Sequence, residues 1–261
     1  NPRARYVFDQ IEQSDSKFCI HLGDMVNPVP ELPSYTTAAN NFHAIASRLS
    51  IPLYLMPGNH DIGDKPVTWM PAGMVNKEHV DLYRHHFGRD YFSFDYETCH
   101  FVIINSPLIN SGDPIEKEQA AWLENDLNEN KSKRIFLFSH YPVYVSNPDE
   151  PESYDNIDEP GRSWLINLIE TYKPEALFAA HVHNFWYDVI GETEYYIVPS
   201  TCFVRHDYSE MYRIDGGSQQ GRNDSAKLGY ITLEVYEKGH VAHYPRSFAR
   251  CLAEDSGAAP P

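Results

Sequence analysis

The chain has 261 residues, of which 42% are hydrophobic, and its formal net charge is −16 at pH 7. Lysine and arginine never cluster, which argues against a nucleic-acid-binding surface, and no apolar run approaches the ~20 residues needed to span a bilayer. The apolar content is sufficient for a packed core, and neither a repeat nor an interdomain break is visible. We therefore expect one domain over residues 1–250, followed by a flexible tail over residues 251–261.

Helices and strands alternate first along the chain, and strands dominate later. Apolar residues at helical spacing predict helices, and short apolar or alternating runs predict strands. The predicted helices are residues 2–13, 38–49, 80–87, 116–127 and 162–172. The predicted strands are residues 18–24, 51–56, 91–96, 101–104, 135–138, 176–180, 186–190, 194–198, 230–236 and 240–244. This order favours two stacked sheets with helices outside.

Polar connections separate these elements. Residues 146–160 are acidic and contain prolines, which predicts an exposed loop, and residues 205–226 form a polar insertion. Arg205 in that insertion is a candidate phosphate contact, although a solvated loop is the favoured interpretation. Trp69 and Tyr154 are loop aromatics that could line a pocket, but aromatic residues more often pack in a core.

Polar side chains stand where four of the predicted strands end. Open α/β sheets place their chemistry at the carboxyl ends of strands. Asp, Asn and His together suit a divalent transition-metal site, and a further His beside them suits proton transfer. The four groups are Gly23-Asp24, Gly58-Asn59-His60-Asp61, His140 and His181-Val182-His183.

This ordered set resembles the calcineurin-like metallophosphoesterase family, whose pattern runs Asp-x-His, Gly-Asp, Gly-Asn-His-Asp/Glu, His and Gly-His-x-His. Four of these five blocks are present between Gly23 and His183. The Asp-x-His block is absent, because only a helix-like stretch and one strand precede Gly23, so we expect an N-terminally truncated domain. The resemblance implies an α/β fold, a four-layer αββα sandwich of two mixed β-sheets flanked by helices.

The resemblance also implies a dinuclear site with two divalent metal ions, such as Mn, Fe or Zn. Two such ions can clamp the attacking and leaving oxygens at phosphorus, and a metal-bound hydroxide is the expected nucleophile. His60 is the candidate general acid, because a histidine can carry a proton at neutral pH. The implied metal ligands are Asp24 as the bridge, Asn59, His140 and His181 for the second ion, and His183 for the first ion.

Two departures from the family pattern affect the site, and the first of them concerns the first ion. Without Asp-x-His it keeps only Asp24 and His183, which is too few for a tight site. Strand alternation points His21 away from the face that Asp24 uses, so it is not an obvious replacement. Ala180 stands where the family usually has glycine, which is harmless if its φ is negative and strained if its φ is positive.

Local geometry leaves two further expectations at the motifs. In an extended segment residues i and i+2 point the same way, so His181 and His183 are expected to address neighbouring ions. Asp61 either orients His60 or caps the following turn, and the sequence does not choose between these roles.

Within the family, several segments resemble the branch of calcineurin-like phosphoesterase domain-containing protein 1, a protein serine/threonine phosphatase. They are Gly58-Asn-His-Asp-Ile-Gly63, Asp90-Tyr-Phe-Ser-Phe94, Asn105-Ser106 and Tyr154-Asp-Asn156. We therefore expect a metal-dependent hydrolase of phosphomonoesters, whose substrate is a phosphorylated small molecule or a phosphoprotein. A phosphodiesterase of the same family, or a scaffold protein without turnover, is the alternative.

The sequence bounds the cellular context less closely. The cysteines are scattered, and a bridge between Cys202 and Cys251 is one pairing that sequence alone cannot decide. Cys19 lies in a strand-like run and is expected to be a buried thiol. No signal peptide is visible, but the N-terminus is expected to be missing, so the compartment stays open with the cytoplasm slightly favoured, and the oligomeric state is undetermined.

Overall fold

The computed structural model describes residues 2–66, 72–202 and 228–244 of the chain. Its helices are α1 (Pro2–Glu12), α2 (Tyr35–Ala46), α3 (Asn59–Ile62), α4 (Lys77–Phe87), the 3₁₀ helix η1 (Ser106–Leu108), α5 (Pro114–Asn130) and α6 (Gly161–Tyr172). Its strands are β1 (Cys19–His21), β2 (Leu53–Leu55), β3 (Phe92–Tyr96), β4 (Cys99–Ile103), β5 (Arg134–Phe138), β6 (Ala176–Ala179), β7 (Trp186–Ile190), β8 (Thr193–Ile197), β9 (Thr232–Val235) and β10 (His240–His243).

The largest sheet has six strands in the order β3-β4-β5-β6-β8-β7. The four central strands run parallel, and the edge strands β3 and β7 are antiparallel to their neighbours. Because parallel strands end at the same edge of a sheet, the residues that follow β5 and β6 meet there. Phe138 at the end of β5 pairs with Phe178 in β6, which brings His140 and His181 to one edge.

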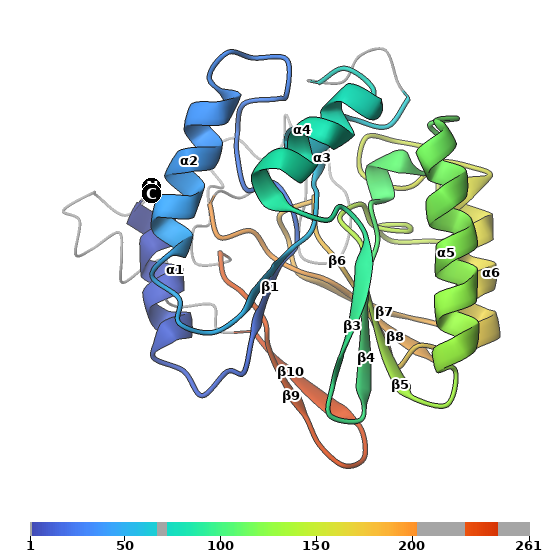
Figure 1. Cartoon of the computed structure of the whole chain (residues 1–261). Helices are drawn as coiled ribbons and strands as arrows, with labels where there is room; N and C mark the ends of the chain where they lie inside the picture. The colour runs from blue at the N-terminus through green and yellow to red at the C-terminus, as the bar shows by residue number, and fades with distance from the viewer. Residues whose placement is uncertain (1, 67–71, 203–227, 245–261) are drawn as a thin grey trace, which may run out of the picture.

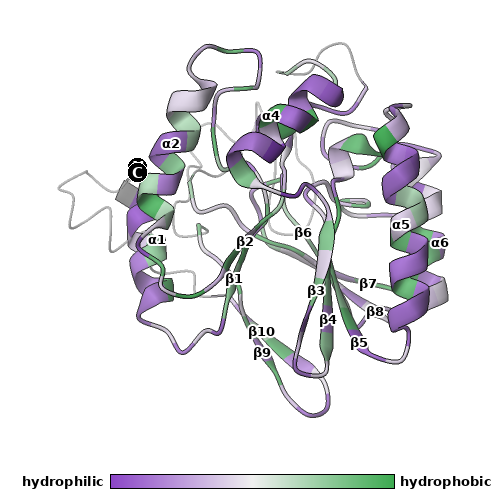
Figure 2. Ribbon diagram, in the orientation of Figure 1, coloured by the Kyte–Doolittle hydropathy of each residue, from purple (hydrophilic) through white to green (hydrophobic). Residues whose placement is uncertain are grey.

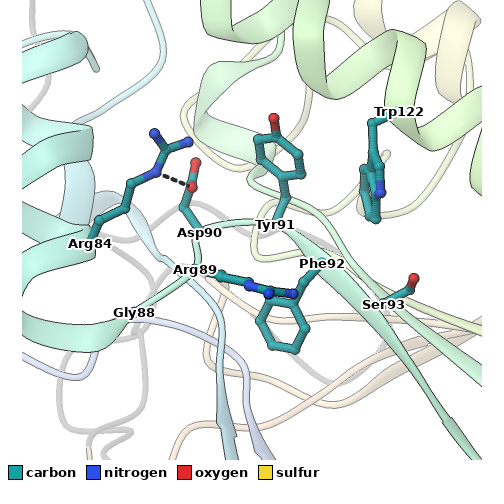
Figure 3. A pocket seen from close by; sticks show the side chains of 8 residues that line it. All are labelled: Arg84, Gly88, Arg89, Asp90, Tyr91, Phe92, Ser93 and Trp122. Carbon is teal, nitrogen blue, oxygen red and sulfur yellow. Dashed lines mark hydrogen bonds and ion pairs between the residues drawn. The ribbon is translucent and has the colours of Figure 1, made fainter.

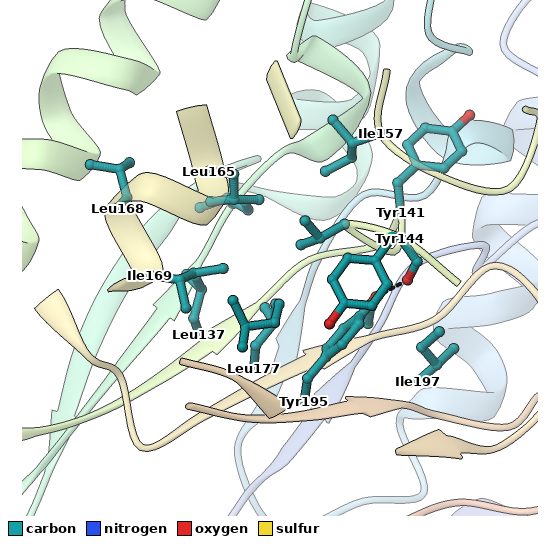
Figure 4. Packing of buried hydrophobic residues seen from close by; sticks show 14 of the residues in the cluster. Leu137, Tyr141, Tyr144, Ile157, Leu165, Leu168, Ile169, Leu177, Tyr195 and Ile197 are labelled. Atoms are coloured by element: carbon teal, nitrogen blue, oxygen red, sulfur yellow. Dashed lines mark hydrogen bonds between the residues drawn. The ribbon is translucent and has the colours of Figure 1, made fainter. Parts of the chain in front are cut away.

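Strand alternation divides the six-stranded sheet into two buried faces. In β5, Ile135 and Leu137 belong to a cluster with residues of α5 and α6, whereas Phe136 and Phe138 belong to a cluster with β1 and β2. Figure 4 shows side chains of the first cluster between the strands and α6. A strand buried on both faces is the expected result of its continuous apolar sequence.

Aromatic rings form a ladder across the second face of this sheet. The stacked pairs Phe94–Phe101, Phe138–Phe178 and Phe178–Tyr196 have ring centroids 5.1, 5.3 and 5.0 Å apart. These separations are typical of offset-stacked rings, which add to the stabilisation from buried area. The alternating aromatics of the segment around Phe94 therefore have a packing role.

The layer that covers the aromatic face consists of two strand pairs. The parallel pair β1–β2 and the antiparallel pair β9–β10 are separate sheets in the part of the chain that the structure describes. Arg134 at the start of β5 attaches the second pair, because its guanidinium donates to the carbonyl oxygens of Tyr236 at 2.5 Å and Gly239 at 2.8 Å.

Helices cover both outer faces and complete four layers. One buried cluster contains Phe8 of α1, Phe42 of α2 and Tyr83 of α4. The partly buried Leu53 of β2 packs against it. Figure 1 shows α1 and α2 on one side of the strands and α5 and α6 on the other. Figure 2 shows hydrophilic and hydrophobic residues alternating along these helices, as expected for surface helices. The predicted αββα arrangement is thus confirmed.

Most predicted elements lie within a few residues of the observed ones, but one predicted loop is not exposed throughout. Residues 146–160 form a loop, yet Asp155, Asn156 and Ile157 are buried, with exposed fractions of 0%, 0% and 2%. The apolar Ile157 side chain enters the cluster between the sheet and α6 and draws its polar neighbours inward.

Other predictions meet the limits of the described residues. Trp69, Arg205, Cys251 and the insertion 205–226 lie outside those residues, as does the tail 251–261, so the domain boundary at residue 250 stays a prediction. Cys19 is partly buried rather than fully buried as predicted, and desolvation raises the pKa of its thiol to about 12. No helix among the described residues is both long and apolar enough to cross a membrane.

We expect His100 to make the stability of the fold dependent on pH. Burial alone would lower its pKa, but hydrogen bonds at 2.8 Å to Asp126 and 2.7 Å to Asp95 outweigh burial and raise it. The contribution of His100 is therefore complete below the unfolded-state pKa of about 6.5 and is lost as the pH rises through the higher folded-state pKa.

The measurement is urea unfolding of the parent and a His100→Gln variant between about pH 6 and about pH 9. The stability advantage of the parent should shrink as the pH rises. His85→Gln, which changes an exposed histidine of α4, is the control. An advantage that stays constant with pH would contradict the prediction.

Candidate metal site

The centre of the site is a close contact between two glycines. Gly23 follows β1 with φ +94°, and a Cβ atom there would lie 2.6 Å from both the Gly58 nitrogen and His140 Nδ1. A Cβ atom at Gly58 would lie 2.3 Å from Asp24 Oδ1. Any side chain at either position would push these groups apart, so the glycines of the Gly-Asp and Gly-Asn-His motifs permit the approach of Asp24 and His140.

Four side chains from four separate strand ends converge beside this contact. His140 Nε2 lies 3.1 Å from Asn59 Oδ1, 3.5 Å from Asp24 Oδ2 and 3.2 Å from His181 Nδ1. His181 Nδ1 also lies 3.1 Å from Asn59 Oδ1. Asp24, His140 and His181 form a group able to hold a metal ion, and the Asn59 oxygen adds a fourth donor.

The spacing of these donor atoms fits a common divalent ion. Two ligand atoms that each lie about 2.1 Å from one ion are roughly 3.0–3.4 Å apart for bond angles between 90° and tetrahedral. The observed separations of 3.1–3.5 Å lie close to this range. Oxygen and imidazole donors without a thiolate suit Mn, Fe or Zn, so the residues present fit the implied metal.

The second ring nitrogen of each histidine is held by a backbone carbonyl. His140 Nδ1 donates to the oxygen of Leu22 at 2.7 Å, and His181 Nε2 donates to the oxygen of Tyr154 at 3.2 Å. These bonds keep a proton on His140 Nδ1 and on His181 Nε2, so in the neutral form of each ring His140 Nε2 and His181 Nδ1 carry the lone pairs that face the other donors. The orientation is the one that metal ligation requires.

The electrostatics of the site favour a charged Asp24. Burial opposes its ionisation, but the charge and hydrogen bond of His140, followed by His60 and His181, hold its pKa well below the usual range. Asp24 has φ +56° directly after Gly23, a backbone conformation that Asp tolerates better than most residues. The turn therefore presents an ionised carboxylate to the three other donors.

His60 lies next to these donors and outside their group. Its backbone nitrogen donates to Asp24 Oδ1 at 3.0 Å, and its Nδ1 donates to the oxygen of Asn27 at 2.6 Å. The ring is half-buried, so His60 Nε2 is the nitrogen left for proton transfer to a bound molecule.

Asp61 has the capping role that the sequence left open. Its carboxylate accepts from the Gly58 nitrogen at 2.9 Å and from the Val26 nitrogen at 3.2 Å. These bonds join the loop after β1 to the loop after β2. Burial raises the pKa of Asp61 to about 8, and the charge of Asp24 adds to that shift.

The backbone around His181 and His183 corrects one expectation. Strand β6 ends at Ala179, and both histidines have left-handed φ values, +65° and +59°, so the segment is not extended and the parity argument was wrong. Among the described residues, His183 stands outside the group formed by Asp24, His140 and His181. Ala180 does not have a positive φ, so it replaces the family glycine without strain.

His21 and the buried loop complete the account of the predicted residues. His21 packs edge-on against the Phe42 ring of α2 at 5.4 Å, and burial lowers its pKa to about 4. Tyr154 and Asp155 were not predicted to contact the donors, although the Tyr154-Asp-Asn156 segment was singled out as typical of one family branch. Tyr154 contacts both Asn59 and His181, and Asp155 Oδ1 lies 3.9 Å from His181 Nε2.

A groove of about 590 Å³ opens between α4, β3 and α5 (Figure 3). Buried Asp90 accepts from Arg84 Nε at 2.7 Å and from Asn105 Nδ2 at 3.0 Å. Two of the branch-like segments, those around Asp90 and Asn105, are therefore in direct contact. Together they fix the start of β3 beside the groove. There the ring centroids of Tyr91 and Trp122 lie 5.0 Å apart.

The sequence of this chain matches a family model over the part that carries the site. The model, described as calcineurin-like phosphoesterase, matches residues 2–185. The chain belongs to this family. It is similar to serine/threonine-protein phosphatase CPPED1 of Danio rerio, with 28% identity over 180 residues that make up 66% of this chain and 55% of that protein. The chain thus spans about half the length of the curated relatives it matches, and the predicted family and branch are confirmed.

Solved structures with the same fold support the phosphoesterase architecture. A purple acid phosphatase, PPD1 of yellow lupin, has a TM-score of 0.62 at 17% identity. The match covers 93% of this chain and 46% of the phosphatase chain. GAP50, described as the anchor in the inner membrane complex of Plasmodium, also has a TM-score of 0.62, at 14% identity, with 93% of this chain and 78% of its own covered. At these identities the likeness shows the fold alone.

Proposed function

We propose that this calcineurin-like phosphoesterase hydrolyses phosphomonoesters, with phosphoprotein as the favoured substrate class, in a metal-dependent reaction. The observation that carries the proposal is the convergence of Asp24, Asn59, His140 and His181 at 3.1–3.5 Å beside His60. Similarity to a protein named as a serine/threonine phosphatase supports the substrate class.

The four converging residues would hold one divalent ion, such as Mn, Fe or Zn. When bound there, that ion supplies Lewis-acid polarisation of a phosphoryl oxygen and lowers the pKa of water. A second ion, as the family resemblance implies, would use His183 together with Asp24. Two such donors are too few for a tight site, so we infer that the first-ion site of this chain is the weaker one.

The chain's own residues supply the acid-base chemistry. His60 Nδ1 is engaged with the Asn27 oxygen, so its Nε2 would hold the proton and transfer it to the leaving oxygen. Backbone contact between His60 and Asp24 fixes this ring beside the donors. This hydrogen bond thus joins His60, the proton donor, to the charged Asp24 at the centre of the site.

The test combines metal binding with turnover. The 261-residue chain is titrated with Mn²⁺ in a calorimeter, and hydrolysis of p-nitrophenyl phosphate, bis-p-nitrophenyl phosphate and a phosphoserine peptide is then measured. We expect one tightly bound ion per chain, turnover of both monoesters that a chelator abolishes, and slower turnover of the diester.

The same measurements separate the alternatives. Faster hydrolysis of the diester would favour the phosphodiesterase function. Tight binding of Mn²⁺ without turnover of any ester would favour the scaffold function, which the weak first-ion site motivates. Absence of Mn²⁺ binding would reject the proposed metal site itself.

A further inference from the structure

Tyr154 contacts two of the four donor residues through two different atoms. Its hydroxyl oxygen accepts a hydrogen bond from Asn59 Nδ2 at 3.2 Å, and its backbone oxygen accepts one from His181 Nε2 at 3.2 Å. Its ring also lies against the His181 imidazole, with centroids 4.7 Å apart. One loop residue therefore touches two side chains that come from distant strand ends.

The hydroxyl contact helps to set which end of the Asn59 amide faces the site. An amide has one donor end and one acceptor end, and only its oxygen can ligate a cation. Because the nitrogen is engaged by Tyr154, the oxygen points toward His140 and His181 at 3.1 Å from each. The Asp64 carboxylate also accepts a hydrogen bond from the Asn59 side chain, so the hydroxyl is one of two groups that hold the amide nitrogen, and its loss weakens that hold.

The carbonyl contact decides the tautomer of His181. With Nε2 donating to the Tyr154 oxygen, Nδ1 keeps the lone pair that faces Asn59 and His140. Partners of this kind orient histidine ligands and raise their basicity. This second contact comes from the backbone, so it persists whichever side chain stands at position 154.

The loop that carries Tyr154 is held on several sides. Lys65, only 3% exposed, donates from Nζ to the Ser153 oxygen at 2.5 Å, the Asn156 oxygen at 2.6 Å and Asp158 Oδ1 at 2.7 Å. The Ile157 side chain is buried in the core, and its nitrogen donates to the Pro142 oxygen. Since Lys65 follows the Gly58-Asn-His-Asp segment closely, it fastens the loop to the same stretch of chain that carries Asn59.

We propose that Tyr154 is a positioning residue of the metal centre, which holds Asn59 and His181 in their ligating orientations through its hydroxyl and backbone oxygens. Lys65 acts one step further out, by fixing the loop from which Tyr154 reaches the site. This inference rests on the proposed metal-dependent function, because it assigns the contacts of Tyr154 to the geometry of the same donor group.

The experiment is Mn²⁺ titration of the parent and a Tyr154→Phe variant, which removes the hydroxyl and keeps the ring and the backbone. We expect Mn²⁺ to bind about 10- to 100-fold more weakly, the loss that follows removal of outer-shell partners. The visible absorption bands of bound Co²⁺ should also change, because the coordinating oxygen of Asn59 is then held less firmly. Lys65→Met should weaken Mn²⁺ binding in the same direction and keeps the inference testable if Tyr154→Phe does not fold.

Tyr144→Phe is the matched control. Tyr144 is a buried tyrosine whose hydroxyl donates to Asp188 at 3.0 Å, outside the donor group. The control should bind Mn²⁺ like the parent. Parent-like Mn²⁺ affinity and Co²⁺ bands in folded Tyr154→Phe would overturn the inference while leaving the proposed function standing. An equal loss of Mn²⁺ affinity in Tyr144→Phe would have the same meaning. Failure of the parent to bind Mn²⁺ would reject both.

Discussion

A His60→Ala variant should lose about 100- to 10,000-fold in phosphatase rate, the usual contribution of a positioned general acid. Its affinity for Mn²⁺ should stay close to that of the parent, because His60 contacts Asp24 through its backbone nitrogen, which alanine retains. Steady-state kinetics and Mn²⁺ titration of the same preparations measure the two effects separately.

The basicity of the leaving group gives a second test of the acid role of His60. Protonation of the leaving oxygen matters most when that oxygen is strongly basic, so the loss should be greater for phenyl phosphate than for p-nitrophenyl phosphate. His79→Ala, a change in a partly buried histidine of α4, serves as the control and should retain the rate. Equal losses with the two substrates would argue against the acid role, and an unchanged rate would exclude it.

A His140→Ala variant should lose most of the metal affinity. His140 Nε2 lies within 3.5 Å of donor atoms from Asp24, Asn59 and His181, so its removal takes away the central member of the group. Since loss of an outer-shell partner typically costs 10- to 100-fold in affinity, we expect loss of this ligand to weaken Mn²⁺ binding by more than about 100-fold. Phosphatase activity at limiting Mn²⁺ should fall by at least as much.

His100→Ala is the matched control for this variant. His100 is also a buried histidine in contact with carboxylates, but it lies between Asp95 and Asp126 and outside the donor group. It should lower stability and leave Mn²⁺ affinity nearly unchanged. If both variants lost Mn²⁺ equally, the effect of His140 would be a loss of fold rather than of a ligand.

The two glycine motifs illustrate what a sequence predicts well. Gly23 and Gly58 stand directly after short apolar runs, and both the strands and the turns follow from local residue preferences. The structure adds the reason for the pairing, because a Cβ atom on either residue would collide with the other motif or with His140. That reason is a contact between segments 35 residues apart, as in the bond from Val26 to Asp61, and no local pattern reveals it.

The loop that contains Tyr154 illustrates what the sequence concealed. Its acidic and proline-rich composition favours exposure, and only the single apolar Ile157 signals the core contact. Besides Ile157, the loop is held by Lys65, which lies 91 residues along the chain from Asn156, whose backbone oxygen it contacts. The sequence does not distinguish a buried lysine with three oxygen partners from a solvated lysine, so the role of Lys65 is seen only in the tertiary structure.

The sequence by itself determined the family, the layered α/β fold and the set of polar residues at the strand ends. It did so because alternation of apolar residues and glycine turns are local properties, and because the order of four motifs is specific. Only the tertiary structure decided that Asp24, Asn59, His140 and His181 converge, with His183 outside this group among the described residues, and that Tyr154 reaches two of them. These relations depend on the left-handed turn at His181 and on packing between distant segments, which the spacing of residues along the chain does not encode.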